Sequence, residues 1–535
     1  MQRDDFLTGV PQRLELRRGL APTPGAVPRP VHQDKSTHVI PLTILSLARS
    51  PIYSSKANTL STARPSLELL CGGARPILSS QEMALRNKLQ AILPPIIAGI
   101  LSACTCDCDT DLAPIVEHRG SSPASEFVSA STVAQVQRQL RSLPENDIWW
   151  TVNGKDMAWN FKNLHQIFPT VNVYRNGPVK QFLRRPNSEI AEYIVETPEG
   201  PMTFAAFIES DLSTTMGVVI LYQGTIVFER YPRMREYEKP VYWSVAKVFV
   251  STVTRILEER GEIDVSLPVD DYLPELANSS FAGISVRNVL DMATGLDCDE
   301  EYVNRESCYY RYSMAIGDGF RTEDAPDSPY DFAASLQVPK KAEPGEKFSY
   351  SGLNTFVLAW LVEKVTDMPF QDAFTREIWY HIGAEADASY IAPRYGIPVT
   401  HGGFMAQMRD LARFGLLFTP SYTVVSDRKI ISDAHIELLR SGGNPDLRLN
   451  AGMPGADESG IKHNVYQWDE IHVNDNFYKG GWAGQGLLVN PTRDLVAVFT
   501  GYFKDDEYSE VPLQPVLFEV LDAVYHGGAG ATDSP

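Results

Sequence analysis

The chain has 535 residues, 43% of them hydrophobic, which is long enough to bury a large core in more than one lobe. Its formal net charge of −19 at pH 7 argues against nucleic acid as a partner, because binding to phosphates requires a basic surface. No internal repeat is evident, which excludes a repeat array. We therefore expect a soluble globular enzyme, and its charge says nothing further about the substrate.

The first 82 residues differ from the rest of the chain in composition and lack periodic apolar patterning. Pro, Ser, Arg and Leu are frequent there, and turn-forming runs such as Ala-Pro-Thr-Pro-Gly at 21–25 interrupt the segment. We predict no fold for residues 1–82. They are interpreted as a misassigned or disordered extension that precedes a true start at Met83.

Residues 83–103 have the architecture of a bacterial signal peptide. A short basic region containing Arg86 and Lys88 precedes an apolar run over 89–101. That run is shorter than the roughly 20 residues that a membrane-spanning helix needs. It ends in Leu-Ser-Ala followed by Cys104, which resembles the lipobox of bacterial lipoproteins. The resemblance implies that Cys104 is the lipidated mature N-terminus and that the protein is anchored by lipid in the periplasm.

A buried helix and an N-terminal membrane anchor are the alternatives for the apolar run. Thr105 follows the cysteine, and the absence of an aspartate at this position favours the outer membrane of a Gram-negative cell. Residues 104–147 are interpreted as a tether with linker chemistry at 121–125. Cys106 and Cys108 lack partners at metal-binding spacing, so we expect no metal and no other cofactor.

Two β-hairpins are predicted, one on each side of a helix-rich middle. β-Rich runs at 216–222 and 225–231 flank a Gln-Gly pair, which fits a two-residue turn. Runs at 485–490 and 495–502 are joined by four residues that also fit a hairpin. An amphipathic helix is predicted at 511–525.

Strands near both ends of the domain predict an α/β (α+β) fold, in which an antiparallel sheet is flanked by helices. The folded domain is predicted over 148–530, with an all-helical lobe inserted at about 262–400 that contains a helix at 355–365. Clefts between lobes often hold ligand sites. Cys298 and Cys308 could form a disulfide in an oxidising periplasm, although their spacing alone leaves this open.

Ser244 and Lys247 form a Ser-x-x-Lys motif at the start of a helix predicted over 244–260. Residues three apart share a helix face, so the amine can take the proton of the hydroxyl and create a nucleophile. The helix is apolar around most of its surface, which indicates burial. Burial lowers a lysine pKa, and the helix N-terminus disfavours a second cation. The alternative is a lysine whose amine reaches water.

Two further segments supply groups that suit the same chemistry. Tyr350 lies in a loop before a predicted helix, and a phenol near a lysine can relay a proton if cations stabilise its anion. Lys479 can hold a carboxylate or stabilise that anion, and the backbone N–H of Trp482 can donate to an oxyanion. Gly480 and Gly481 would let a ligand approach the backbone. A packed tyrosine and a glycine-rich hairpin with a solvated lysine are the alternatives.

Taken in order, these motifs resemble the serine β-lactamase and penicillin-binding protein superfamily: Ser-x-x-Lys, Pro-Gly-Glu followed by Tyr-Ser, and Lys-Gly-Gly before the final hairpin. They are most similar to the class C β-lactamase-related serine hydrolases, which include family VIII esterases and 6-aminohexanoate-dimer hydrolases. Segments 284–296, 402–404 and 409–415 extend the resemblance, which covers about residues 215–505. It implies a β-lactamase-like fold.

The resemblance also implies roles for the motif residues. Ser244 would be the acylated nucleophile, Lys247 its hydrogen-bonded base, and Tyr350 a proton relay to the leaving group and to the deacylating water. The backbone N–H groups of Ser244 and Trp482 would form the oxyanion hole. Whether Lys247 or Tyr350 is the base stays open.

Two departures from the family pattern bear on the substrate. β-Lactamases of the family usually carry Asn two residues after the tyrosine, where this chain has Gly352, and Asn354 is the amide that could substitute. The third motif has Gly480 in place of the usual hydroxyl residue and lacks the histidine of many esterase-like relatives. These departures favour an ester or a linear amide over a β-lactam.

The sequence therefore predicts a lipid-anchored serine hydrolase that forms an acyl-enzyme on a small ester, amide or peptide. β-Lactamase and D-alanyl peptidase are the alternatives within that class. From another class, a non-catalytic envelope protein that binds peptidoglycan-like ligands stays open, although a binder would not need Ser244, Lys247 and Tyr350 together. The pocket walls are expected around 299–320, and the sequence does not decide the substrate.

Overall fold

The computed structural model describes residues 152–525. The predicted extension at 1–82, the signal peptide at 83–103 with Cys104, and the tether at 104–147 lie outside the described residues. Among the residues described, no helix is both long enough and apolar enough to cross a membrane.

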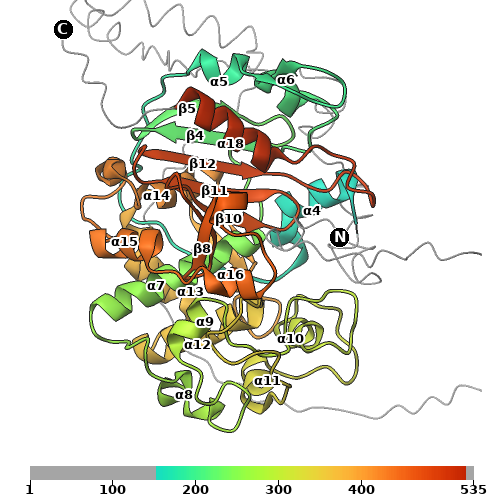
Figure 1. The fold of residues 1–535 in the computed structure, drawn as a ribbon, viewed down its shortest axis with the longest axis vertical. Coiled ribbons are helices and arrows are strands. Elements are labelled where there is room, and N and C mark those ends of the chain that lie inside the picture. The colour runs from blue at the N-terminus through green and yellow to red at the C-terminus, as the bar shows by residue number, and fades with distance from the viewer. Residues whose placement is uncertain (1–151, 526–535) are drawn as a thin grey trace, which may run out of the picture. The chain divides into compact units, whose positions relative to one another are not determined.

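A seven-stranded antiparallel sheet with the order β5-β4-β12-β11-β10-β9-β8 forms the centre of the domain (Figure 1). The neighbours β4 and β12 pair although almost the whole domain separates them in the chain. The strands are β4 (Gly217–Tyr222), β5 (Thr225–Arg230), β8 (Ile461–Val465), β9 (Trp468–His472), β10 (Phe477–Gly481), β11 (Gln485–Asn490) and β12 (Leu495–Thr500).

Both predicted hairpins are confirmed. Gln223 and Gly224 connect β4 to β5 with φ of 49° and 70°, the left-handed pair that a two-residue hairpin turn requires. Strands β8, β9 and β10 were not predicted from the sequence. Buried charged residues and glycines occupy β9 and β10, so their alternation of apolar and polar residues is weak.

Helices cover both faces of the sheet, and alternate residues of each strand point to opposite faces. Val219 and Leu221 pack in the larger core with α7 (Lys247–Glu259) and α14 (Met408–Leu416). Val218 and Ile220 pack in a second core with α18 (Leu513–Val524). Because both faces are buried, the central strands read as continuous apolar runs.

The remaining elements surround the sheet or form the inserted lobe. The helices are α4 (Gly154–Ile167), α5 (Ser188–Glu192), α6 (Phe204–Glu209), α8 (Val269–Tyr272), α9 (Val286–Leu290), α10 (Cys308–Ile316), α11 (Pro329–Ser335), α12 (Gly352–Thr366), α13 (Phe370–Glu377), α15 (Asp433–Ser441), α16 (Asp446–Asn450) and α17 (Ala456–Ser459). The 3-10 turns are η2 (Trp243–Ala246), η3 (Pro274–Leu276), η4 (Trp379–His381) and η5 (Pro420–Val424). The short strands are β1 (Thr170–Val173), β2 (Ile194–Val195), β3 (Met202–Thr203), β6 (Ala388–Ile391) and β7 (Phe404–Met405).

The inserted lobe at 262–400, predicted to be all helical, is helical except for β6. This strand pairs antiparallel with β1 and β7. Both partner strands of β6 lie outside residues 262–400, so the sequence of the lobe alone contains no pattern that predicts this sheet. The helix predicted at 355–365 is α12, which begins three residues earlier at Gly352.

Candidate active site

Ser244 lies in η2, the 3-10 turn that leads directly into α7. The preceding residue, Trp243, has φ of 44°, a left-handed conformation that bulky residues rarely adopt. Strand β10 packs against this turn, and a Cβ atom at Gly481 would lie 2.4 Å from the carbonyl oxygen of Tyr242. Gly481 therefore admits the chain's own backbone beside Ser244, and its predicted role in letting a ligand approach stays a prediction.

Lys247 is the first residue of α7, and its side chain is 0% exposed. Its Nζ lies 2.9 Å from Ser244 Oγ, which confirms that the two motif residues face each other. Two more acceptors surround the amine: Glu300 Oε1 at 3.0 Å and the His401 carbonyl oxygen at 3.0 Å. The alternative of an amine that reaches water is wrong.

Tyr350 lies in the loop before α12, between two lysines. Its hydroxyl accepts a hydrogen bond from Lys479 Nζ at 2.8 Å. The Nζ atoms of Lys247 and Lys479 each lie 4.7 Å from the centre of its ring. Burial raises the pKa of the Tyr350 phenol well above its ordinary value, and the opposing effect of a hydrogen bond with Ser244 is smaller. Tyr350 is thus a protonated phenol that can donate to a leaving group.

Lys479 lies in β10 and is also 0% exposed. It forms an ion pair with Asp469 of β9 at 2.5 Å, and the backbone N–H of Gly480 donates to the other oxygen of that carboxylate at 3.0 Å. Burial lowers the pKa of Lys479 to about 8, although the Asp469 carboxylate opposes this change. These contacts favour the predicted support of Tyr350, while the predicted binding of a substrate carboxylate stays a prediction.

Three site residues, Glu300, His401 and Asp469, were absent from the sequence-based set. Glu300 lies in a segment rich in acidic residues, a composition that is typical of a solvent-exposed loop. His401 directly precedes the glycine pair of the 402–404 segment, which is the one signal that could have drawn attention to it. Its ring lies between the Tyr312 hydroxyl at 2.9 Å and an Asp318 oxygen at 3.0 Å.

The departure at Gly352 has a steric reason. A Cβ atom there would lie 2.7 Å from the Tyr309 hydroxyl and 2.8 Å from His401 Cδ2, so these side chains occupy the space that a larger residue would need. Asn354 is 2% exposed, and its amide nitrogen donates to Met292 Sδ at 3.5 Å. Its predicted role in substrate binding stays a prediction.

Trp482 follows β10 and is largely buried in an aromatic cluster. Its ring makes edge contacts with Trp243 at 5.9 Å and Phe503 at 5.4 Å, measured between ring centres. This packing fixes the chain on the β10 side of η2, close to Ser244. The oxyanion hole predicted from the N–H groups of Ser244 and Trp482 stays a prediction.

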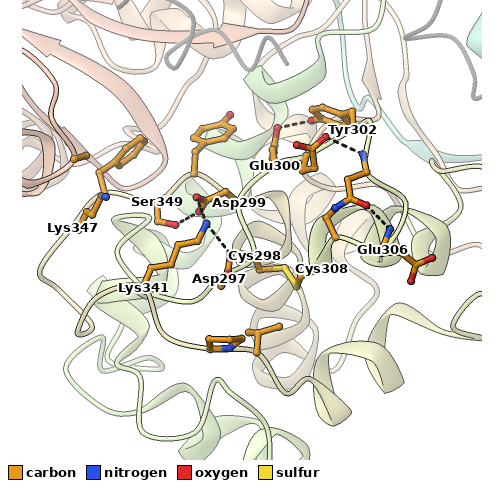
Figure 2. A pocket seen from close by; sticks show the side chains of 18 of the residues that line it. Asp297, Cys298, Asp299, Glu300, Tyr302, Glu306, Cys308, Lys341, Lys347 and Ser349 are labelled. Carbon is orange, nitrogen blue, oxygen red and sulfur yellow. Dashed lines mark hydrogen bonds and ion pairs between the residues drawn. A yellow bond between two sulfur atoms is a disulfide. The ribbon is translucent and has the colours of Figure 1, made fainter. Parts of the chain in front are cut away.

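A cavity of about 690 Å³ lies beside these residues, and Glu300 and Tyr350 are in its wall (Figure 2). The disulfide between Cys298 and Cys308 is part of the same wall. Much of the lining comes from residues 297–308, which overlaps the pocket wall expected around 299–320. Two of the acidic side chains there, Asp297 and Asp299, are paired with Lys341, which contacts each of them at 2.8 Å.

Within residues 152–525, no group of three or more His, Cys, Asp or Glu side chains is arranged to hold a metal ion. The groups of this site that can carry chemistry are the side chains of Ser244, Lys247, Tyr350 and Lys479 and their carboxylate partners. A hydroxyl held by a buried lysine, beside a protonated phenol, is the arrangement of a serine hydrolase with a lysine-activated nucleophile.

A family model described as Beta-lactamase matches residues 203–506, which is more than half of the chain. The protein belongs to the Beta-lactamase family and is a hydrolase of that serine-dependent group. The three motifs from which the resemblance was drawn all lie inside the matched region.

Individual proteins give the same result. The chain is 29% identical over 352 residues to 6-aminohexanoate-dimer hydrolase from Paenarthrobacter ureafaciens, covering 65% of this chain and 86% of that protein. It is 24% identical over 213 residues to Beta-lactamase from Providencia stuartii, covering 38% and 50% of the two chains. A solved structure from Bacillus anthracis, assigned provisionally as a 6-aminohexanoate-dimer hydrolase, matches with a TM-score of 0.59 at 23% identity, covering 69% and 93%. This last likeness supports the fold alone.

Proposed function

We propose that this hydrolase acts on an ester or a linear amide through an acyl-enzyme on Ser244. The observation that carries the proposal is the 2.9 Å hydrogen bond between Ser244 Oγ and the buried Nζ of Lys247. A protein that only binds ligands has no need of an activated hydroxyl with a phenol beside it. The alternative of a non-catalytic binding protein is therefore disfavoured.

The proposed reaction has two halves. Lys247 removes the proton of Ser244 as its Oγ attacks the substrate carbonyl, and the N–H groups of Ser244 and Trp482 stabilise the oxyanion. Tyr350 then donates its phenolic proton to the leaving alcohol or amine, supported by Lys479 at 2.8 Å. In the second half, a water oxygen attacks the acyl carbon while a water proton passes to the same phenol. The Oγ–C bond then breaks, Lys247 returns a proton to Ser244 Oγ, and the acid product leaves.

The proposed substrate class rests on the steric situation at Gly352. The space of the usual asparagine side chain is taken by Tyr309 and His401, so the substrate amide lacks its customary partner at that position. The relative from Paenarthrobacter ureafaciens is named for the hydrolysis of 6-aminohexanoate dimer, which supports a linear amide or ester. β-Lactamase and D-alanyl peptidase activities are the less favoured outcomes.

The test is a labelling and substrate-panel experiment on the full chain. A fluorophosphonate probe should label wild type but not Ser244→Ala, and Ser244→Ala should lose on the order of 10⁶-fold in turnover. Ser251→Ala is the matched control, because Ser251 is a buried serine of the same helix whose hydroxyl donates to the Val248 carbonyl. A short nitrophenyl ester and a linear amide should be hydrolysed faster than a chromogenic cephalosporin. A folded wild type that resists the probe would contradict the proposal.

We also propose that the protein is a lipoprotein anchored through Cys104 to a bacterial membrane, on the periplasmic side. The lipobox-like sequence before Cys104 supports this, and a disulfide between Cys298 and Cys308 suits an oxidising compartment. Expression in a Gram-negative host with an alkyne-labelled fatty acid should label the wild type and Cys106→Ser but not Cys104→Ser. Retention of the label in Cys104→Ser would contradict lipidation at this residue.

A further inference from the structure

Glu300 contacts both groups that serve the nucleophile, although it lies in none of the three motifs. Its Oε1 accepts a hydrogen bond from Lys247 Nζ at 3.0 Å. Its backbone N–H donates to the carbonyl oxygen of Tyr350 at 3.1 Å. Its second oxygen accepts from the Tyr302 hydroxyl at 2.5 Å, and its side chain is 6% exposed. One buried carboxylate residue thus fixes the positions of both the lysine and the tyrosine.

The hydrogen bonds of Lys247 also indicate a role for Glu300 in proton transfer. Three acceptors surround Nζ, namely Ser244 Oγ, Glu300 Oε1 and the His401 carbonyl oxygen. An ammonium group has three N–H bonds, and when all three are donated it has no lone pair to receive the proton of Ser244. Lys247 must therefore release one proton as it takes another. Of the two remaining acceptors, only the carboxylate of Glu300 can become protonated.

We infer that Glu300 is a positioning residue that holds Lys247 against Ser244 and takes up the proton that Lys247 releases during acylation. The inference rests on the proposed acyl-enzyme on Ser244. In this step the Oγ–H bond of Ser244 breaks and an Oγ–C bond forms, while the π electron pair of the substrate carbonyl moves to its oxygen. One proton passes from Oγ to Nζ, and another passes from Nζ to Glu300 Oε1.

The protons balance over the whole cycle. When the tetrahedral adduct collapses, the bond to the leaving oxygen or nitrogen breaks and that atom takes the Tyr350 proton, which Lys479 replaces. In deacylation, water returns one proton to the Tyr350 and Lys479 pair, and Glu300 returns the other through Lys247 to Oγ. Burial alone would raise the pKa of Glu300, but the Lys247 ammonium and the Tyr302 hydroxyl hold it below its ordinary value. The carboxyl group therefore gives its proton back.

The decisive variant is Glu300→Gln in the full chain, which keeps the size of the side chain and an oxygen for Lys247 but cannot accept a proton. The pre-steady-state acylation burst with a nitrophenyl ester should fall by ~10²-fold at every pH. Glu300→Asp, which keeps the carboxylate, should retain more activity than Glu300→Gln. Glu363→Gln is the matched control, because Glu363 also accepts a hydrogen bond from a tyrosine hydroxyl, that of Tyr330 at 2.7 Å, but lies on α12 outside the lining of the cavity.

The pH profile separates this role from a purely electrostatic one. The charged and titratable groups that act on Glu300 or its lysine partner are Tyr302 on the same loop, Tyr309 and Tyr312 of α10, Lys247 of α7, His401, Tyr350 and Lys479. If Glu300 only held Lys247 in its protonated form, Glu300→Gln would keep the plateau rate and move the ascending limb to lower pH. That result, or an equal loss in Glu363→Gln, would overturn the inference.

A measurement on wild type keeps the inference testable even if Glu300→Gln fails to fold. Two protons move together in the inferred acylation step, so the rate in mixtures of H₂O and D₂O should curve with the deuterium fraction. A linear dependence indicates one moving proton and overturns the role of Glu300. A wild type that the fluorophosphonate probe does not label refutes the proposed acyl-enzyme itself, so the two failures are distinguishable.

Discussion

Two lysine–carboxylate pairs flank the nucleophile, and they are built differently. Lys479 and Asp469 belong to adjacent strands, β10 and β9, and the N–H of Gly480 holds the carboxylate in place. Lys247 begins a helix, but its partner Glu300 comes from a stretch without regular structure between Cys298 and Cys308. Tyr350 lies between the two amines.

The difference indicates that one pair mainly stabilises the structure of the site, while the other mainly takes part in proton transfer. The strand-borne pair, Lys479 and Asp469, is held by the hydrogen bonds between β9 and β10. Burial lowers the pKa of Lys479 to about 8, which suits a group that returns a proton to a phenol. The loop-borne pair, Lys247 and Glu300, depends for its geometry on the Cys298–Cys308 disulfide and the few contacts of the Glu300 loop. We therefore expect the Lys479 pair to matter more for stability and the Lys247 pair to matter more for acylation.

Replacing each lysine by methionine tests the catalytic half of this comparison and should give the largest effect. Lys247→Met removes the base and should slow acylation by ~10⁴-fold. Lys479→Met should slow turnover by only ~10²-fold and should let the acyl-enzyme accumulate, because the phenol loses its proton source. Burst kinetics and mass spectrometry of the trapped intermediate measure both quantities. A greater loss of acylation in Lys479→Met would reverse the assignment.

Asp469→Asn tests the structural half. Asp469 is 3% exposed, so the change leaves the Lys479 cation buried without its carboxylate partner, and the single amide oxygen cannot serve both Lys479 and the Gly480 N–H. The free energy of unfolding should fall by about 3–5 kcal/mol. Glu300→Gln should cost less, because Lys247 keeps Ser244 Oγ and the His401 carbonyl as acceptors. Urea unfolding of the two variants at one pH gives the comparison, and equal losses would contradict it.

Opening the disulfide tests whether the loop-borne pair depends on its covalent anchor. Cys298 and Cys308 are separated by 10 residues, and closing a loop of that size contributes about 2–3 kcal/mol. A Cys298→Ser, Cys308→Ser double variant should lose that stability and roughly tenfold in kcat/KM, because Glu300 is held less firmly. A reducing agent should lower the activity of wild type and leave the double variant unchanged. An unaffected wild type would show that the other contacts of the loop suffice.

The smallest effect expected is a shift in pH dependence. Activity should fall above a pH of about 8, because neutral Lys479 cannot reprotonate Tyr350. Asp469 raises the pKa of Lys479, so Asp469→Asn should move this descending limb to lower pH. The folded-state pKa lies below the ordinary 10.5, so the unfolded state binds more protons between these values and this lysine makes stability rise with pH there. If the descending limb does not move in Asp469→Asn, that limb does not report the titration of Lys479.

Local sequence signals were enough to predict the parts of the fold with strong periodicity. The hairpins at β4–β5 and β11–β12 have apolar runs and turn residues that specify them. Ser244 and Lys247 share a helix face by spacing alone, and the 2.9 Å contact confirms it. Strands β9 and β10 were missed because their buried charges satisfy one another across the sheet, a pairing that no local pattern contains.

The sequence by itself determined the family, the serine proposed as nucleophile and the lysine beside it, because these depend on residues close together in the chain or on motifs in a fixed order. Tertiary structure decided which carboxylate each lysine meets. Glu300 is 53 residues from Lys247. Asp469 is only 10 residues from Lys479, on the adjacent strand, but the Tyr350 hydroxyl that Lys479 also contacts comes from 129 residues away. A buried charge is stable only with a partner, and the partner is chosen by how the sheet and the inserted lobe pack together.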